Sequence, residues 1–274
     1  MTSPRSRFQD AVNRLISGST RFELVYTTHP SWPQPATSSI STSTKISVLD
    51  SSFNPPTLAH SALASSSSAN ARLLLLSLSN VDKTPKPGDA TPAQRLDMMV
   101  ALADELSAGG EQPGVAVGAL NEPRFVGKST LLLEQLSQRF TDTPPNIELT
   151  FQMGWDTIIR VFAPRYYPSP DAMLASFKHF FESEGSTILC ARRPPLRPSI
   201  SIPTTLSDEE SDFLSSPYVA PFYQKGKIKL VDLDPSVSGI SSSGVRGGTI
   251  EDAERWCSEG VVRYIREHQL YFRN

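Results

Sequence analysis

The sequence predicts an α/β protein built on a doubly wound, mostly parallel sheet with helices on both faces. Two observations favour this class. From residue 45 to the end, short apolar runs alternate with segments of helical periodicity. The run 73–76, within a strand expected at 73–78, is continuously apolar, as expected of a strand that helices cover on both faces. In such a sheet, ligands bind at the carboxyl ends of the strands.

Six core strands and at least five helices are expected in this alternation. The strands are predicted at 46–49, 73–78, 115–120, 147–153, 187–191 and 228–231. The helices are predicted at 58–66, from 91, at 129–140, and as a closing pair within 250–271. Thr91 followed by Pro92 favours a helix start, because a hydroxyl caps the first turn and proline fits its first position.

The first 44 residues predict an N-terminal helix and a Ser/Thr/Pro-rich extension. Phe8, Val12 and Leu15 recur at helical spacing, 22–26 suits a small strand, and 30–44 is rich in Ser, Thr and Pro. Residues 45–274 then form the main domain. Insertions are expected at about 163–185 and 194–220, and the acidic run 208–212 in the second suggests a segment without fixed structure.

Composition excludes several classes of protein. The 274 residues carry a formal charge of −2, and this balance does not argue for binding of duplex nucleic acid, which usually needs a basic face. Two cysteines, Cys190 and Cys257, cannot build a disulfide framework or a zinc site. No apolar run approaches the roughly 20 residues of a membrane span. The arginine-containing N-terminus also holds Asp10 and Glu23, so cytosol or nucleus is expected rather than the mitochondrion.

The segment 48–60 is the most informative part of the chain. An apolar strand breaks at Asp50 into a loop with Asn54 and two prolines, and His60 lies near the start of the next helical pattern. A strand, a tight loop and a helix N-terminus in this order gather backbone N–H groups around an anion.

Two short motifs resemble those of the nicotinamide mononucleotide adenylyltransferase family of nucleotidyltransferases, with its divergent fungal members as the nearest match. One is Ser-Phe-Asn-Pro-Pro at 52–56 with Thr57 and His60, and the other is Ile-Ser-Ser-Ser-Gly-Val-Arg at 240–246. Segments 82–87, 95–99 and 154–156 follow the order of the same family. The resemblance implies a Rossmann-like fold and transfer of AMP from ATP to nicotinamide mononucleotide, giving NAD and pyrophosphate.

The resemblance also assigns roles to individual residues. His60, Thr57 and Arg246 would hold the phosphates during catalysis, with Thr57 as a hydroxyl donor where relatives often have a first histidine. Lys83 and Lys86 would bind the acceptor phosphate. The remaining nucleotide-binding candidates are Ser52, Phe53, Asn54, Gly154, Asp156, Ser241, Ser242 and Ser243.

The expected partners are ATP and the mononucleotide, with Mg²⁺ carried by the triphosphate because no carboxylate cluster suggests a metal cage. A homo-oligomer is left open. Phe125 and 128–130 stand where relatives hold the pyridine ring, but they match that part of the family pattern poorly. Two alternatives therefore remain: another phosphate acceptor, with ATP or CTP as donor, and a diverged regulatory protein that binds or hydrolyses ATP. A P-loop is excluded, because Glu122 stands where its first glycine is required.

Overall fold

One seven-stranded sheet organises the computed structural model, which describes residues 6–33, 43–78, 88–108, 113–138, 146–192 and 206–272. The strands are β1 (Phe22–Thr27), β2 (Ser43–Ser51), β3 (Ala71–Ser77), β4 (Gly114–Leu120), β5 (Asn146–Gly154), β6 (Thr187–Ala191) and β7 (Ile228–Val231). Their order is β1-β4-β3-β2-β5-β6-β7, and each neighbouring pair is parallel except β1 with β4. The predicted doubly wound α/β class is confirmed.

The chain winds outward in both directions from β2. Strands β3 and β4 follow on one side, and β5, β6 and β7 follow on the other. The strand order therefore reverses between β2 and β5, which are neighbours through pairs such as Val48 with Phe151. A reversal of this kind leaves a crevice at the carboxyl ends of the two strands, where open α/β sheets bind ligands.

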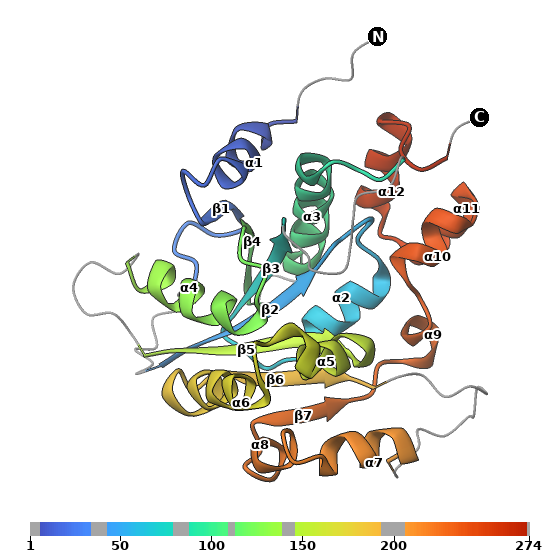
Figure 1. The fold of residues 1–274 in the computed structure, drawn as a ribbon. Helices are drawn as coiled ribbons and strands as arrows, with labels where there is room; N and C mark the ends of the chain where they lie inside the picture. The colour runs from blue at the N-terminus through green and yellow to red at the C-terminus, as the bar shows by residue number, and fades with distance from the viewer. Residues whose placement is uncertain are drawn as a thin grey trace.

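Helices cover both faces of the sheet (Figure 1). They are α1 (Gln9–Ile16), α2 (Leu58–Ser65), α3 (Pro92–Ser107), α4 (Phe125–Ser137), α5 (Trp155–Val161), α6 (Pro170–Lys178), α7 (Asp208–Ser215), α8 (Ala220–Gln224), α9 (Pro235–Ser238), α10 (Ser242–Gly247), α11 (Ile250–Trp256) and α12 (Glu259–Glu267), with short helical turns at Pro164–Tyr166 and His179–Ser183. The predicted start of α3 is confirmed: Thr91 Oγ1 accepts a hydrogen bond from the Gln94 backbone N–H at 3.3 Å.

Strand β3 shows how the sheet separates two apolar layers. Leu73 and Leu75 pack in the layer that holds α4, α5 and α6, whereas Leu74 and Leu76 pack in the layer that holds α1, α2 and α3. Alternate side chains of a strand point to opposite faces, so a strand buried on both sides must be apolar throughout. All four leucines are almost completely buried.

The N-terminal residues belong to the same sheet. Strand β1 pairs with β4 in antiparallel fashion and forms the sheet edge, and α1 buries Val12 and Leu15 against the α3 layer. The helix and strand expected near the N-terminus are thus present as α1 and β1. They complete one edge of the main domain.

Both segments expected as insertions contain ordered helices that contact the core. The first buries Phe177, Phe180 and Phe181 completely beneath the sheet. The expectation that 208–212 lacks fixed structure is wrong, because these residues lie in α7. Glu210 there is 4% exposed and forms an ion pair with Arg192 at 2.6 Å, which compensates the burial of its charge.

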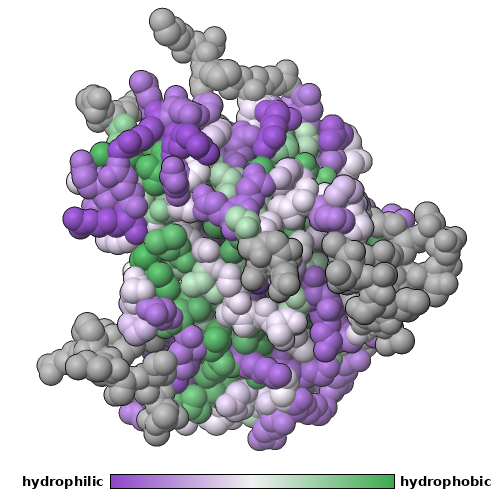
Figure 2. All heavy atoms as spheres, turned by 180° about the vertical axis from the view of Figure 1, so that it is seen from behind, coloured by the Kyte–Doolittle hydropathy of each residue, from purple (hydrophilic) through white to green (hydrophobic). Residues whose placement is uncertain are grey.

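The surface gives few signs of an apolar contact face. In the part of the chain that the structure describes, the large hydrophobic side chains with substantial exposure are Ile16 (65%) and Leu206 (42%). Figure 2 shows polar residues over most of the visible face, with apolar residues mainly in one vertical band. No helix among the described residues is long and apolar enough to cross a membrane.

Candidate active site

A cavity of about 1640 Å³ opens at the carboxyl ends of β2 and β5, at the point where the strand order reverses. Three segments that lie far apart in sequence meet there: the β2–α2 loop, the turn from β5 into α5, and the start of α10. Of the candidates drawn from the sequence, those that line the cavity are Ser52, Asn54, His60, Gly154, Asp156, Ser241, Ser242, Ser243 and Arg246. Lys83 and Lys86 lie outside the described residues.

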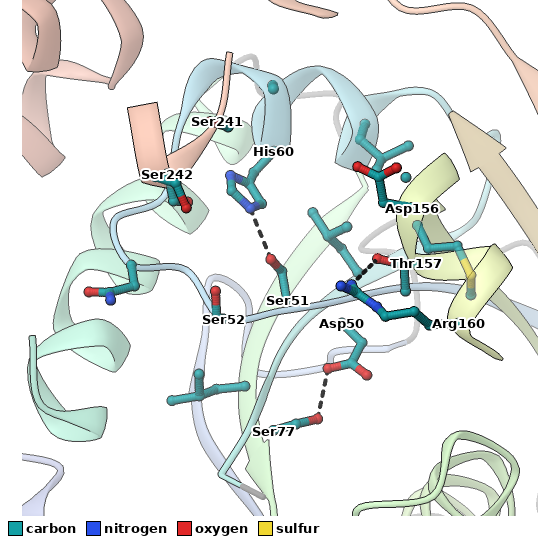
Figure 3. A pocket seen from close by; sticks show the side chains of 18 of the residues that line it. Asp50, Ser51, Ser52, His60, Ser77, Asp156, Thr157, Arg160, Ser241 and Ser242 are labelled. Carbon is teal, nitrogen blue, oxygen red and sulfur yellow. Dashed lines mark hydrogen bonds between the residues drawn. The ribbon is translucent and has the colours of Figure 1, made fainter. Parts of the chain in front are cut away.

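His60 lies in the first turn of α2, and both its ring nitrogens have hydrogen-bond partners. The Thr57 backbone N–H donates to Nδ1 at 3.0 Å, so Nδ1 must act as an acceptor. In the neutral imidazole the proton is therefore on Nε2. Nε2 lies 3.0 Å from Ser51 Oγ, on the cavity wall (Figure 3). The loop thus holds His60 as an N–H donor directed at the floor of the site.

Thr57 does not face the cavity. Its side chain is 1% exposed, and its Oγ1 lies 2.8 Å from His60 Nδ1. The prediction that this hydroxyl donates to a phosphate is therefore corrected: Thr57 lies behind the imidazole and fixes the orientation of the ring. The residue types at 57 and 60 match the expected motif, but only His60 presents a polar atom to the site.

Phe53 anchors the loop in the core. Its side chain is completely buried and does not line the cavity, and its ring centroid lies 5.0 Å from that of His60. Its φ of 44° is in the left-handed region, which a bulky residue adopts only when its surroundings hold it there. Packing of Phe53 therefore sets the path of the backbone that carries Ser52 and Asn54 along the cavity.

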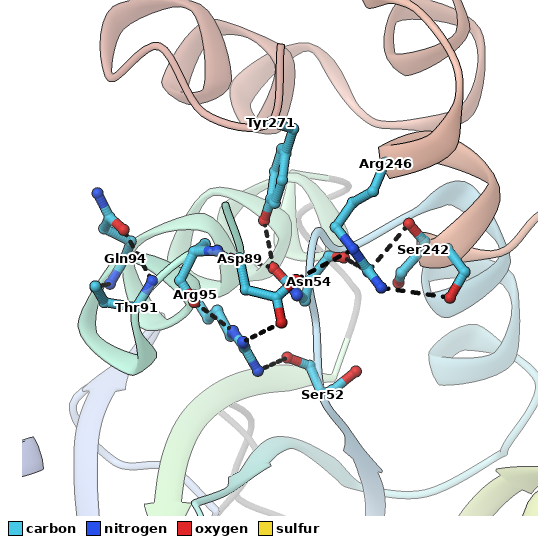
Figure 4. Close-up of polar contacts among 11 residues, drawn as sticks. Ser52, Asn54, Asp89, Thr91, Gln94, Arg95, Ser242, Arg246 and Tyr271 are labelled. Carbon is cyan, nitrogen blue, oxygen red and sulfur yellow. Dashed lines mark hydrogen bonds and ion pairs between the residues drawn. The ribbon is translucent and has the colours of Figure 1, made fainter. Parts of the chain in front are cut away.

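Hydrogen bonds join the two motif halves directly. Ser242 Oγ donates to the Pro55 carbonyl at 2.8 Å, across 187 residues of sequence. Arg246 Nη1 donates to the Asn54 carbonyl and, at 3.2 Å, to the Ser242 carbonyl. The loop before α2 and the helix α10 are thus one connected unit, as Figure 4 shows.

Two residues that sequence reasoning missed complete this unit. Asp89 Oδ1 lies 3.3 Å from Arg246 Nε, and the Tyr271 hydroxyl donates to Asn54 Oδ1 at 2.8 Å (Figure 4). Burial raises the pKa of Tyr271, so its hydroxyl stays a donor. Arg95 also lines the cavity and donates to the Ala90 carbonyl at 2.8 Å.

A buried ion pair forms the wall beside β3. Lys128 Nζ lies 2.5 Å from Asp50 Oδ2, and Ser77 Oγ donates to Asp50 Oδ1 at 2.7 Å. The Lys128 and Asp50 side chains are 10% and 15% exposed. Phe125, at the start of α4, lines the same side and packs on Phe151 with ring centroids 5.0 Å apart.

The opposite wall is formed by β5, β6 and α5. A Cβ at Gly154 would meet no atom within 4 Å, so a ligand can approach the backbone there. Arg160 on α5 lines this wall and was not singled out from the sequence. Trp155, which lines the cavity, is 3% exposed and donates from Nε1 to Glu209 at 3.2 Å, so its indole ring is packed into this wall.

Among the described residues, no group of three or more His, Cys, Asp or Glu side chains could hold a metal ion. Two of the carboxylates that line the cavity, Asp50 and Asp89, form ion pairs with Lys128 and Arg246. The side chains of the site are therefore suited to anions, with imidazole, guanidinium and hydroxyl groups as donors.

The sheet is doubly wound, and the loop before His60 is hydrogen-bonded to the Ser-Ser-Ser-x-x-Arg segment of α10 at the point where the strand order reverses. Together these features define a Rossmann-like nucleotidyltransferase. Comparison with known proteins agrees. The chain is 31% identical, over 82% of its length and 86% of the relative, to a Schizosaccharomyces pombe protein described by inference as a nicotinamide mononucleotide adenylyltransferase. The chain belongs to the nicotinamide mononucleotide adenylyltransferase family.

The fold also matches a solved structure. The nicotinic acid mononucleotide adenylyltransferase of Plasmodium falciparum, complexed with NaAD, superposes with a TM-score of 0.50 at 16% identity. The match covers 83% of this chain and 97% of that one. At this identity the likeness shows the fold alone. No family model matches the sequence.

Proposed function

We propose that this protein transfers AMP from ATP to nicotinamide mononucleotide, releasing NAD and pyrophosphate. The observation that carries the proposal is the hydrogen-bonded union of the two motif halves around His60 at one cavity. Ser242 binds the loop of the first half, and Arg246 binds the carbonyl of Asn54. Membership of the family supports the same reaction.

The reaction needs alignment and positive charge more than covalent chemistry. An acceptor phosphate oxygen attacks the α-phosphorus of ATP in line with the departing pyrophosphate, so negative charge shifts toward the leaving group. His60, with its proton on Nε2, donates a hydrogen bond without having to change protonation state. Arg246 Nη2, which has only a 3.4 Å contact with Ser243 Oγ among the bonds described, adds a charged donor.

ATP enters as its magnesium complex, in which the metal offsets the charge of the phosphate oxygens. The residues of this chain then bind the phosphate oxygens that the magnesium ion does not contact. Ser241, Ser242 and Ser243 line the cavity together with Arg246, and the Ser242 hydroxyl donates to the Pro55 carbonyl. The chain's contribution is thus a fixed set of donors, pre-organised before the substrate arrives.

We assign adenosine to the side of the cavity that is lined by the segment between β7 and α10, and the acceptor to the wall beside β3. Leu233, Gly239 and Ile240 line the cavity immediately before the serines, so a nucleoside attached to the triphosphate continues along them. The acceptor then meets Asp50, Lys128 and Phe125.

The test is acceptor dependence. Purified protein with ATP, Mg²⁺ and nicotinamide mononucleotide should form NAD and pyrophosphate in equal amounts, and should release no pyrophosphate without the acceptor. Release that ignores the acceptor would instead support ATP hydrolysis by a diverged family member. Transfer only to another phosphate would retain the enzyme class and change the substrate.

A further inference from the structure

Three charged side chains meet at the edge of the cavity where the polyphosphate is proposed to bind. One carboxylate oxygen of Asp89 lies 3.3 Å from Arg246 Nε, and the other lies 3.8 Å from Arg95 Nη2. The side chains of Asp89, Arg95 and Arg246 are 14%, 15% and 25% exposed, and all three line the cavity. One carboxylate is therefore the shared ion-pair partner of two guanidinium groups, at the end of the cavity where the polyphosphate is proposed to bind.

The two arginines do not depend on Asp89 for their positions. Arg246 also donates to the carbonyls of Asn54 and Ser242. Arg95 donates to the carbonyl of Ala90 at 2.8 Å and to that of Ser52 at 3.5 Å. Backbone carbonyls of the surrounding loops thus hold both side chains, and a carboxylate added to such a pair chiefly offsets charge.

The charge needs an offset because the arginines are partly buried. Burial lowers the pKa of Arg95, and the neighbouring Arg246 acts in the same direction, while Asp89 raises it. With no polyphosphate bound, two guanidinium groups beside one another repel, and the Asp89 carboxylate neutralises part of that repulsion. A bound polyphosphate would supply the same neutralisation.

We propose that Asp89 is an internal counter-ion that competes with the polyphosphate for Arg246 and Arg95 and so promotes release of pyrophosphate. The inference rests on the proposed function. When ATP binds, its phosphates displace the carboxylate from the guanidinium groups. After transfer, the tethered carboxylate pairs with them again and lowers their affinity for the departing product. Asp89 thus acts through the charge of the two arginines and sets the affinity of the site for polyphosphate.

The decisive variant is Asp89→Asn, which keeps the shape and one acceptor oxygen but removes the charge. The Asp89 carboxylate repels a bound anion, so removing its negative charge from this partly buried site should tighten binding of magnesium pyrophosphate by about tenfold. Isothermal titration calorimetry measures that affinity, and inhibition of turnover by added pyrophosphate should strengthen in parallel. Asp212→Asn, an exposed α7 variant with the same change in net charge, should leave both unchanged.

A second pair of variants assigns the effect to Arg246. In an Arg246→Ala background, Asp89→Asn should tighten pyrophosphate binding much less, because the main guanidinium group for which Asp89 and pyrophosphate compete is absent. Asp89→Ser is made in parallel, and the melting temperature of each variant is recorded. If the Asp89 role were structural, both variants would bind pyrophosphate more weakly.

The outcomes separate this proposal from the proposed function. Binding by Asp89→Asn that equals or falls below that of the wild type, in a folded variant, overturns the counter-ion role, as does a wild type that does not bind pyrophosphate. If the wild type binds pyrophosphate with the predicted response to Asp89→Asn but forms no NAD, the counter-ion role stands and the proposed acceptor fails.

Discussion

Lys128→Met should destabilise the protein strongly, because it leaves the Asp50 carboxylate buried without its cation. The Nζ–Oδ2 distance is 2.5 Å, and the two side chains are 10% and 15% exposed. Breaking such a pair by removing one partner costs about 3 to 5 kcal/mol, since the remaining charge keeps its desolvation penalty. The Ser77 hydroxyl bond to Asp50 offsets only part of that penalty.

The chain supplies a matched control for this variant. Lys225 and Glu182 form a pair with a similar Nζ–Oε1 distance of 2.6 Å, but their side chains are 59% and 42% exposed. Lys225→Met should therefore cost about 0 to 1 kcal/mol. Urea denaturation of both variants and the wild type gives the two free energies of unfolding. Similar small losses for both variants would refute the argument from burial.

A double variant identifies the cause. If the loss in Lys128→Met comes from an unpaired charge, adding Asp50→Asn should recover a large part of it, because the carboxylate is then gone. If it came from lost packing of the lysine stem, the second substitution would recover nothing. The same urea denaturation experiment distinguishes these results.

Three further predictions follow from the site and its surroundings. Thr57→Val should lower kcat less than about tenfold, because the backbone N–H of residue 57 still fixes the tautomer of His60. A loss of kcat as large as that in His60→Ala would contradict this expectation. The hydrogen bond from Arg192 holds the pKa of Glu210 below its usual value, so the pair stabilises the fold above the unfolded pKa, and this stability is lost as pH falls through the folded one. The free energy of unfolding of Arg192→Met should therefore vary less with pH between about pH 3 and 6 than that of the wild type. The same pH dependence in both proteins would contradict a stabilising ion pair between Arg192 and Glu210. Burial raises the pKa of Cys190 to about 12, so native protein at pH 8 should resist alkylation at this thiol, and mass spectrometry showing rapid labelling would contradict it.

The sheet was predictable because its signal is local. A strand buried on both faces must be apolar along its length, and the runs that became β3 and β4 satisfy this condition over most of their residues, whereas β5 alternates apolar residues with Glu148, Thr150 and Gln152. The motif residues were predictable from resemblance, because two short motifs occur in the order that the family shows. The cavity brings most of them together.

The contacts between distant segments were not predictable in this way. Asp89 and Tyr271 lie next to the motif halves only because α3 and the C-terminal residues fold over the same loop, and neither occurs in a recognisable pattern. The burial of Thr57 is also a tertiary effect. Its residue type suits a phosphate donor, but the loop turns its hydroxyl toward His60. The acidic run in α7 was misjudged because composition does not reveal the cation, Arg192, that accepts Glu210.

The most direct test of the account measures NAD and pyrophosphate from ATP, Mg²⁺ and nicotinamide mononucleotide, with wild type and His60→Ala side by side. The account predicts equal formation of both products by the wild type. In folded His60→Ala, turnover should fall by about two to three orders of magnitude, the usual loss of a donor to developing charge. Unchanged NAD formation in the variant would remove His60 from the mechanism, and pyrophosphate without NAD would contradict the transferase itself.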